Sequence, residues 1–405
     1  WQSTVDGDWA DAANWDPNTG YPNDPADTAI FTNLFMATNQ AVTVTLPANA
    51  VTVGVLRVLY ASNVYVLTGG RLVMTNSAST NALISTSTPA PNWPRPTYLT
   101  IRSELEILQD TVIAAPSYNP PDGVMVAGPL HGSGTITRGS TGSPGGYCAF
   151  TNAASRFDGV LRVHAGYSTY VYNDAMSNAA EVLVSYNARF GCYGADRIKK
   201  TTINTIGAFT FPGGSGGSSY GEWVLNCTGA TVECYSGRSL YGLLQGTGIV
   251  QFAGNSPVSF LGGIKPGIDG VGSVSLIRAG GTPVLGSTAS RAQLHIDIAG
   301  PGGVPGVDHD YLFVKNLLAP LSLSNIVLHV TGNSGATTNW FMDVQGTGTL
   351  SYVGTFFDVT NAPTIIVHMI YDTENRRIGV VAFPEPALLL SLLACAVPAL
   401  RRKRN

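Results

Sequence analysis

The sequence predicts an all-β protein, and three observations support that prediction. Short runs of β-branched and aromatic residues, separated by Gly, Asn, Ser and Pro, recur from Val42 to the C-terminal tail. Helical periodicity of useful length is nearly absent from the 405 residues. The 47 glycines and 24 prolines supply many tight turns, while 44% of the residues are apolar, which is enough to bury a core.

The clearest predicted strand spans residues 291–298. Its apolar positions alternate with polar ones, so that Ala292, Leu294, Ile296 and Ile298 face one way and the polar groups face the other. Similar but shorter runs lie at 42–46, 64–67, 71–74, 181–184 and 326–330. Each run is short enough to form one rung of a β-solenoid.

A repeated Gly-hydroxyl-Gly pattern precedes several apolar runs. It occurs at 132–136, 246–250 and 346–350. Glycine reaches backbone conformations closed to other residues, so the pattern predicts a corner followed by a strand. Phosphate binding would need a helix N-terminus and usually a Lys after the glycines, and neither follows any copy.

The charge of the chain narrows the possible partners. Charged residues make up 12% of the sequence, against about 25% in an ordinary soluble protein, and the formal net charge is −3. Such a chain has no broad cationic field for phosphates, which excludes nucleic acid as a partner.

The two ends of the sequence predict export. The numbering begins at Trp1 rather than at Met, which predicts a removed secretory signal peptide. At the other end, Pro384-Glu385-Pro386 precedes the apolar run 387–400, and a basic cluster closes the chain: Arg401, Arg402, Lys403 and Arg404. The apolar run is shorter than the about 20 residues of a spanning helix, and its basic flank favours a transient membrane stop over a buried core helix.

This three-part tail resembles the PEP-CTERM sorting signal of Gram-negative bacteria. The resemblance implies recognition by an exosortase-type processing enzyme, cleavage near Pro384-Glu385-Pro386, and contact with the membrane only through the tail. It also implies that the protein is released or anchored at the cell surface or in an extracellular polymer matrix.

A second resemblance concerns the body of the chain. Residues 130–166, which contain GSGTITR, FTNAASRFDG and VLRVHAG, resemble the autotransporter-associated β-strand repeat of passenger-like surface proteins. That family implies a right-handed parallel β-helix. Because the strand runs of this chain vary in length and long insertions interrupt them, a β-sandwich-like C-terminal part is the alternative. The expected organisation is an Asp/Trp-rich N-terminal segment at 1–40, a β-solenoid region at 41–262, a C-terminal β region at 263–382 and the sorting tail at 383–405.

Four of the five cysteines lie before the tail, an even number that permits two disulfides in an exported protein. Cys227 and Cys234 are the local candidates, across a short turn. Buried thiols are the alternative, and the absence of a C-x2-C pair argues against zinc.

The N-terminal segment offers candidates for two kinds of contact. Asp6, Asp8 and Asp11 could bind calcium through oxygen ligands at short spacing, although Asp is also a common turn and cap residue. No other cofactor is expected. The tryptophans nearby could stack on sugars, but capping of a β core or self-contact with another copy is the favoured interpretation; they are Trp1, Trp9 and Trp15.

No set of residues predicts a catalytic site. Asp308, His309 and Asp310, with His295 and Asp297, form the densest ionisable cluster of the second half, but their Gly/Pro-rich context predicts a solvated loop. The carboxylates of Glu104 and Glu106 are too generic to assign, because their spacing in the fold cannot be read from the sequence.

The sequence therefore predicts an exported, non-catalytic structural or adhesive protein of the bacterial cell surface or extracellular matrix. Copies of the chain are the first expected partner, assembling into a fibre or sheath, and extracellular polysaccharide is the second. The alternatives are a polysaccharide-active β-helix lyase or hydrolase and a monomeric glycan-binding adhesin. Aligned carboxylates with an Arg or Lys would favour the enzyme, and an exposed aromatic platform would favour the adhesin.

Overall fold

The computed structural model divides the chain into two compact units. Unit 1 comprises Trp1–Trp223 and Ala230–Arg238, and unit 2 comprises Val224–Gly229 and Ser239–Asn405. The structure describes residues 1–32, 41–59, 64–77, 80–86, 98–115, 123–139, 146–164, 168–185, 188–193, 195–204, 209–211, 217–219, 221–234, 238–252, 257–280, 282–300, 303–332, 337–346, 352–361 and 365–384. Within these residues the only helices are two single 3-10 turns, η1 (Ala12–Asn14) and η2 (Leu323–Asn325), so the predicted all-β class is confirmed.

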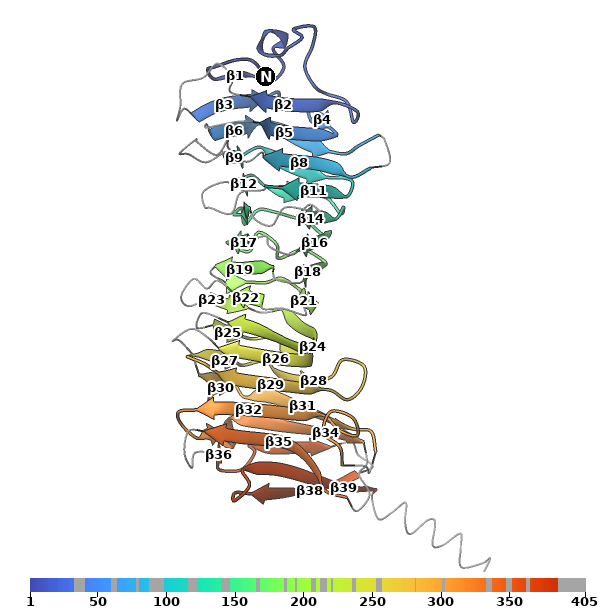
Figure 1. Cartoon of the computed structure of the whole chain (residues 1–405), viewed down its shortest axis with the longest axis vertical. Coiled ribbons are helices and arrows are strands. Elements are labelled where there is room, and N and C mark those ends of the chain that lie inside the picture. The colour runs from blue at the N-terminus through green and yellow to red at the C-terminus, as the bar shows by residue number, and fades with distance from the viewer. Residues whose placement is uncertain are drawn as a thin grey trace, which may run out of the picture. The chain divides into compact units, whose positions relative to one another are not determined.

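Unit 1 is built from ladders of short parallel strands (Figure 1). The first ladder runs through β1 (Gly7–Asp8), β3 (Ala41–Leu46), β6 (Val64–Gly69), β9 (Tyr98–Ile101), β12 (Gly123–Val126), β15 (Tyr147–Phe150), β17 (Ser168–Tyr172), β19 (Arg189–Tyr193) and β22 (Phe209–Phe211). The second runs through β2 (Thr28–Thr32), β5 (Val55–Leu59), β8 (Ala82–Thr86), β11 (Thr111–Ala114), β14 (Ile136–Arg138), β16 (Val160–Val163), β18 (Glu181–Ser185) and β21 (Lys200–Asn204).

A third, shorter ladder lies between the other two along the chain. It contains β4 (Val51–Val53), β7 (Arg71–Met74), β10 (Glu104–Ile107) and β13 (Leu130–His131), again all parallel. A parallel pair β20 (Ala195–Asp196) and β23 (Gly217–Ser219) follows later in unit 1. Two strands lie at the division between the units, β24 (Glu222–Cys234) and β25 (Arg238–Leu240).

The register of the ladders aligns apolar residues into stacks. One stack joins six buried side chains in successive strands of the first ladder: Val44, Leu67, Ile101, Val126, Phe150 and Val171. Because a parallel strand that is shifted by one residue would turn this face outward, burial of the stack fixes the register. These in-register contacts form the core of unit 1.

One cation lies inside this core. Arg138 is fully buried, pairs in register with Ile113 and Val163, and donates a hydrogen bond through Nη1 to the Ile113 carbonyl. Burial raises the pKa of the Cys148 thiol, and the nearby Arg138 guanidinium partly offsets that shift. The sequence alternation did not predict a charge at this position, where burial is costly unless the group is hydrogen-bonded.

Unit 2 also contains two parallel ladders, which share a long strand. The first half of β26 (Leu243–Phe252) pairs with β28 (Gly263–Pro266), followed by β31 (Ala292–Ile298), β34 (Ile326–Gly332) and β37 (Asp358–Asn361). Its second half pairs with β29 (Ser273–Arg278), followed by β32 (Tyr311–Leu317) and β35 (Asn339–Gly346). Shorter parallel pairs are β27 (Val258–Phe260) with β30 (Pro283–Leu285), and β33 (Leu321–Ser322) with β36 (Tyr352–Val353).

The pairing changes at the last two strands. β38 (Ile365–Asp372) and β39 (Arg377–Pro384) form an antiparallel hairpin, and β39 also pairs antiparallel with β35. Because β-sandwiches are made of antiparallel sheets, the parallel ladders of unit 2 do not fit the sandwich expected as an alternative for the C-terminal part.

Two of the three copies of the Gly-hydroxyl-Gly pattern lie at corners of the chain, as predicted, and residues 347–350 of the third copy lie outside the described residues. Gly132 and Gly246 have φ values of 99° and 111°. A Cβ atom would lie 2.1 Å from the Ile107 carbonyl oxygen at Gly132 and 2.0 Å from the Leu225 carbonyl oxygen at Gly246. Glycine is therefore required at both positions. The Gly246 corner lies inside β26, where the strand changes partner from β28 to β29.

Candidate functional site

The three predicted self-contact tryptophans form an aromatic cap on unit 1. Trp1, Trp9 and Trp15 are 5%, 0% and 4% exposed. The ring centroids of Trp9 and Trp15 are 4.9 Å apart, and all three rings lie within 5.8 Å of the ring of Phe31 in β2. The Trp15 indole nitrogen donates to the Trp9 carbonyl at 2.7 Å. The rings cover the core, which leaves almost no ring surface for a contact with a second copy or with a sugar.

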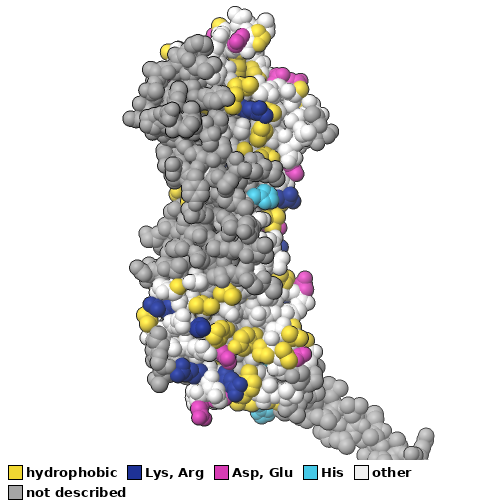
Figure 2. Space-filling model, in the orientation of Figure 1, with side chains coloured by type: hydrophobic (Ala, Val, Ile, Leu, Met, Phe, Trp, Pro, Cys, Tyr) yellow, Lys and Arg dark blue, Asp and Glu magenta, His cyan; other side chains and the backbone are white. Residues whose placement is uncertain are grey.

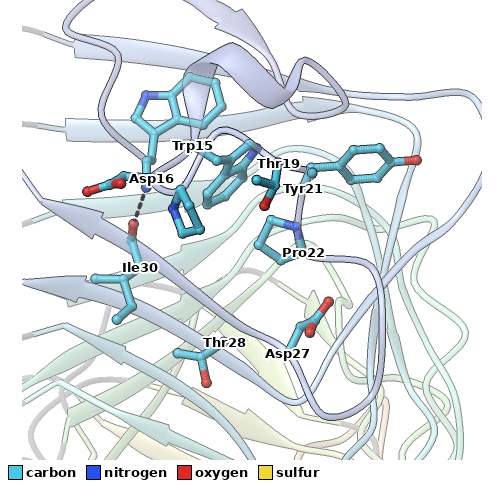
Figure 3. A pocket seen from close by; sticks show the side chains of 11 residues that line it. Trp15, Asp16, Thr19, Tyr21, Pro22, Asp27, Thr28 and Ile30 are labelled. Carbon is cyan, nitrogen blue, oxygen red and sulfur yellow. Dashed lines mark hydrogen bonds between the residues drawn. The ribbon is translucent and has the colours of Figure 1, made fainter.

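A hollow of about 370 Å³ lies beside this cap (Figure 3). Its lining includes Trp15, the carboxylates of Asp16 and Asp27, and the ring of Tyr21, which is 37% exposed. The hydrogen bond drawn in Figure 3 joins the Trp1 backbone nitrogen to the Ile30 carbonyl at 2.6 Å. The size suits a small polar ligand, but Asp27 already accepts a hydrogen bond from the Asn23 backbone.

The calcium candidates hold turns of the backbone. Asp6 accepts a hydrogen bond from the Thr43 backbone nitrogen at 2.7 Å, and Asp11 caps η1 by accepting from the Ala13 nitrogen at 3.0 Å. Asp8 is exposed at the end of β1. In the described part of the chain, no group of three or more His, Cys, Asp or Glu residues is placed to hold a metal ion.

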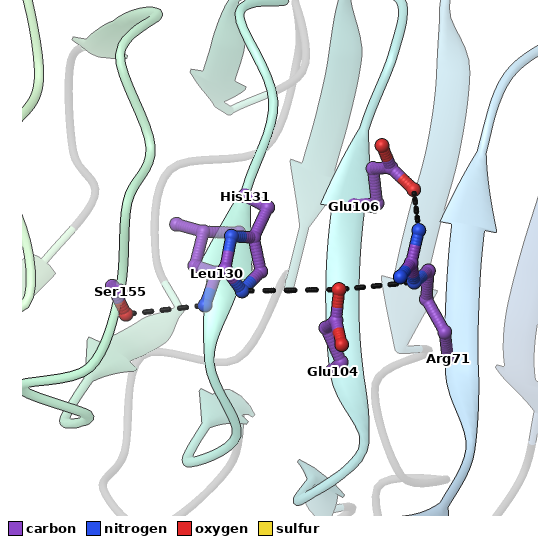
Figure 4. A network of polar contacts seen from close by, with 6 residues as sticks. All are labelled: Arg71, Glu104, Glu106, Leu130, His131 and Ser155. Atoms are coloured by element: carbon purple, nitrogen blue, oxygen red, sulfur yellow. Dashed lines mark hydrogen bonds and ion pairs between the residues drawn. The ribbon is translucent and has the colours of Figure 1, made fainter.

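A network of charged side chains crosses the third ladder of unit 1 (Figure 4). The Arg71 guanidinium in β7 contacts two carboxylates of β10, with Nε 2.9 Å from Glu104 Oε1 and Nη1 3.0 Å from Glu106 Oε2. On β13, His131 Nε2 lies 3.8 Å from the same Glu104 oxygen. The register explains the arrangement, because Arg71 pairs with Glu104 and Glu106 pairs with His131.

This arrangement brings together carboxylates that the sequence left unassigned. Glu104 and Glu106 are two residues apart on one strand, so their side chains point to the same face, and one guanidinium offsets their repulsion. Two carboxylates with an imidazole can perform acid–base chemistry when a substrate binds between them. The same-face spacing was visible in the sequence, whereas the partner strand that carries Arg71 was not.

The predicted solvated loop is confirmed for residues 303–308, which are exposed or half-buried, but it is wrong for His309 and Asp310. His309 and Asp310 are both 0% exposed. Asp310, the residue before β32, accepts hydrogen bonds from the backbone nitrogen of Gly272, the residue before β29, at 2.8 Å and from that of Asp297 in β31 at 2.9 Å. Burial raises the pKa of Asp310 to about 7, although the two backbone N–H groups partly oppose that shift. Asp310 is therefore a structural group that takes up a proton near neutral pH.

Polar side chains line the outer face of the strands beside Asp310. His295 and His329 pair in register, and their rings stack with centroids 4.5 Å apart. Burial, followed by the nearby His329 and Lys265, lowers the pKa of His295. Lys265 lies 3.5 Å from the Asp297 carboxylate. The structure thus brings Asp297 close to Asp310 and Lys265, but the ionisable groups of this cluster bond to the backbone and to neighbouring strands rather than around a cavity.

The predicted Cys227–Cys234 disulfide is wrong. Both residues lie on the single strand β24, without the expected turn between them, and Cys227 has a buried thiol. Seven residues of extended strand span about 23 Å, whereas a disulfide needs Cα atoms less than about 7 Å apart. Cys148 also has a buried thiol.

The sorting tail lies almost entirely outside the described residues. Of the tail at 383–405, the structure describes only the backbone of Phe383 and Pro384, the last two residues of β39. The remaining positions are not: Glu385, Pro386, Arg401, Arg402, Lys403 and Arg404. No helix in the described part of the chain has the length and apolar composition needed to cross a membrane.

Comparison with protein-family models, with curated proteins and with solved structures finds no match to this chain.

Proposed function

We propose that the chain is an exported, non-catalytic structural or adhesive protein of the bacterial cell surface or extracellular matrix, built as a right-handed parallel β-helix. The observation that carries the proposal is the regular parallel pairing of short strands, each with the next strand of its ladder. Such scaffolds gain stability from nearest-neighbour contacts and display long faces. A stable scaffold with long faces suits a structural component of the cell surface better than it suits a protein that acts through one pocket.

The sorting tail supports the proposed location. Its apolar run and basic end would hold the chain at the membrane until an exosortase-type enzyme removes them near Pro384-Glu385-Pro386. Fractionation of the producing cells, with mass spectrometry of the C-terminal peptide, tests this. We expect a mature chain in the surface or extracellular fraction that ends near Pro384, and an intact tail on protein confined to the cytoplasm would contradict it.

Self-assembly is part of the proposal, and β38 supports it. Among the described strands β38 pairs only with β39. Ile366 is 38% exposed, and the following apolar residues Val367, Met369 and Ile370 are half-buried. A strand with an open edge and apolar side chains on both faces is a template for pairing with another chain. Copies of this chain are therefore the proposed first partner.

A polysaccharide-active lyase or hydrolase is the second candidate, because Arg71, Glu104 and Glu106 align on neighbouring strands. The side chains are between 23% and 46% exposed and already bond to one another, which fits a surface ion network.

A double variant separates the two functions. If the chain is a structural protein, the double variant Glu104→Gln with Glu106→Gln lowers the free energy of unfolding by no more than about 1 kcal/mol. Neither the native protein nor the double variant then releases reducing or unsaturated ends from a panel of polysaccharides. Release of such ends by the native protein, lost in the double variant, would establish the enzyme instead.

A further inference from the structure

The outer face of the β29–β32–β35 ladder in unit 2 carries half-exposed aromatic side chains. The inward residues of these strands are buried, as the fully buried Val274, Leu312 and Met342 show. The residues that alternate with them face outward, among them Tyr311 and Phe313. Figure 2 shows hydrophobic side chains gathered over this part of the molecule, with charged side chains among them.

The two rings lie next to each other with polar groups around them. Their centroids are 6.4 Å apart and their planes differ by only 19°. The Tyr311 hydroxyl hydrogen-bonds to the Asp343 carboxylate, and Lys315 Nζ lies 5.9 Å from the Phe313 ring centroid. We define the aromatic face by the outward residues of this patch: Ser275, Tyr311, Phe313, Lys315, Asp343 and Gln345.

The register places the polar groups on both sides of the rings. Phe313 pairs with Ser275 on β29 and with Asp343 on β35, and Lys315 pairs with Gln345. Side chains opposite one another on adjacent strands have Cβ atoms about 5 Å apart, so hydroxyl, carboxylate, amide and ammonium groups all lie within reach of a molecule resting on the rings. The patch thus combines apolar surface with hydrogen-bonding groups at its margin.

We propose that the aromatic face binds a neutral polysaccharide of β-linked pyranoses. The C–H faces of such sugars pack on aromatic rings, and their equatorial hydroxyls meet the surrounding donors and acceptors. The charge of the face supports a neutral polymer, because Lys315 and Asp343 cancel and leave no net attraction for a polyanion. The inference rests on the proposed function, since this contact would be its adhesive step.

A second copy of the chain fits this face less well. The centres of protein–protein interfaces are depleted of charged residues, and an isologous contact would bury Lys315 and Asp343 of both copies. β38, which is nearly free of charge, is the better surface for self-contact.

Affinity electrophoresis of the full chain tests the proposal, with hydroxyethylcellulose as the neutral β-linked probe, dextran as the α-linked probe and alginate as the anionic one. We expect retardation by hydroxyethylcellulose alone. Phe313→Ala should weaken the apparent affinity roughly tenfold, because one stacked ring is lost, while Tyr311→Phe keeps its ring and should bind within about threefold of the native chain.

Phe357→Ala is the matched control. It removes a 55% exposed ring of the same unit that the Arg291 guanidinium already covers at 3.4 Å, so it should leave retardation unchanged. Absence of retardation of the native chain, or equal retardation of Phe313→Ala, would overturn the proposal. So would retardation by alginate, or a Phe313→Ala variant that loses self-association in sedimentation without any change in retardation. The native protein's cell fraction and C-terminal peptide, measured separately, report on the proposed function whichever result is obtained.

Discussion

Replacing Trp9 by alanine is expected to destabilise the N-terminal end of unit 1 by about 3 to 5 kcal/mol, the cost of emptying a buried tryptophan site. The Trp9 ring is fully buried against Trp15 and Phe31, and its indole nitrogen donates to the Pro22 carbonyl at 2.9 Å. The variant loses both the packing and the hydrogen bond. Because repeated strands depend mainly on their neighbours, the loss should be local.

Hydrogen–deuterium exchange of the full chain measures this effect by region. We expect faster exchange in β1, β2 and β3 of the Trp9→Ala variant, with little change in unit 2. Tyr21→Ala is the control, because it removes an exposed ring from the same segment. If β2 and β3 of the Trp9→Ala variant exchange as slowly as in the native chain, the aromatic cap does not stabilise the N-terminal strands.

Raising the pH from 4 to 7 is expected to lower the stability of unit 2 through Asp310. The pKa of Asp310 is raised to about 7 in the folded chain, from an ordinary value of 3.8, chiefly by burial. As the pH rises, Asp310 therefore loses its proton near pH 4 in the unfolded chain but only near pH 7 in the folded chain. Its contribution to the free energy of unfolding is complete below about pH 4 and is lost as the pH rises through 7. Three pKa units correspond to a loss on the order of 4 kcal/mol.

Denaturant unfolding of the full chain at several pH values measures whether the stability falls as the pH rises. Asp310→Asn should flatten the decline between pH 4 and 7, whereas Asp269→Asn, at an exposed carboxylate of the same unit, should leave it in place. Parallel pH curves for the native and Asp310→Asn proteins would show that Asp310 ionises normally. A decline in the opposite direction would mean that the two backbone N–H groups outweigh burial.

Much of the strand pattern could be predicted because alternation is a local property. The predicted facing of Ala292, Leu294, Ile296 and Ile298 is confirmed in β31, where all four are buried. The predicted runs at 42–46 and 64–67 likewise fall in β3 and β6. In each case neighbouring residues decide which side chains face the core.

The candidate sites depended on contacts between distant residues, which local patterns do not contain. Arg71 contacts Glu106, which lies 35 residues later in the chain, only because β7 and β10 pair in one register. Asp310 follows a Gly/Pro-rich stretch that is typical of a loop, yet its side chain is buried and accepts hydrogen bonds from the backbone nitrogens of the distant residues Gly272 and Asp297. The disulfide prediction failed because the short turn expected between Cys227 and Cys234 is absent, and the single strand β24 contains both residues.

Negative-stain electron microscopy of native protein, taken from the surface fraction of producing cells, tests the central claim most directly. A structural protein that assembles from its own copies should appear as regular filaments or sheets, and a charged substitution at β38, Ile366→Lys, should disperse them. Dispersed single particles in the native sample, at the concentration found on the cell surface, would contradict the account.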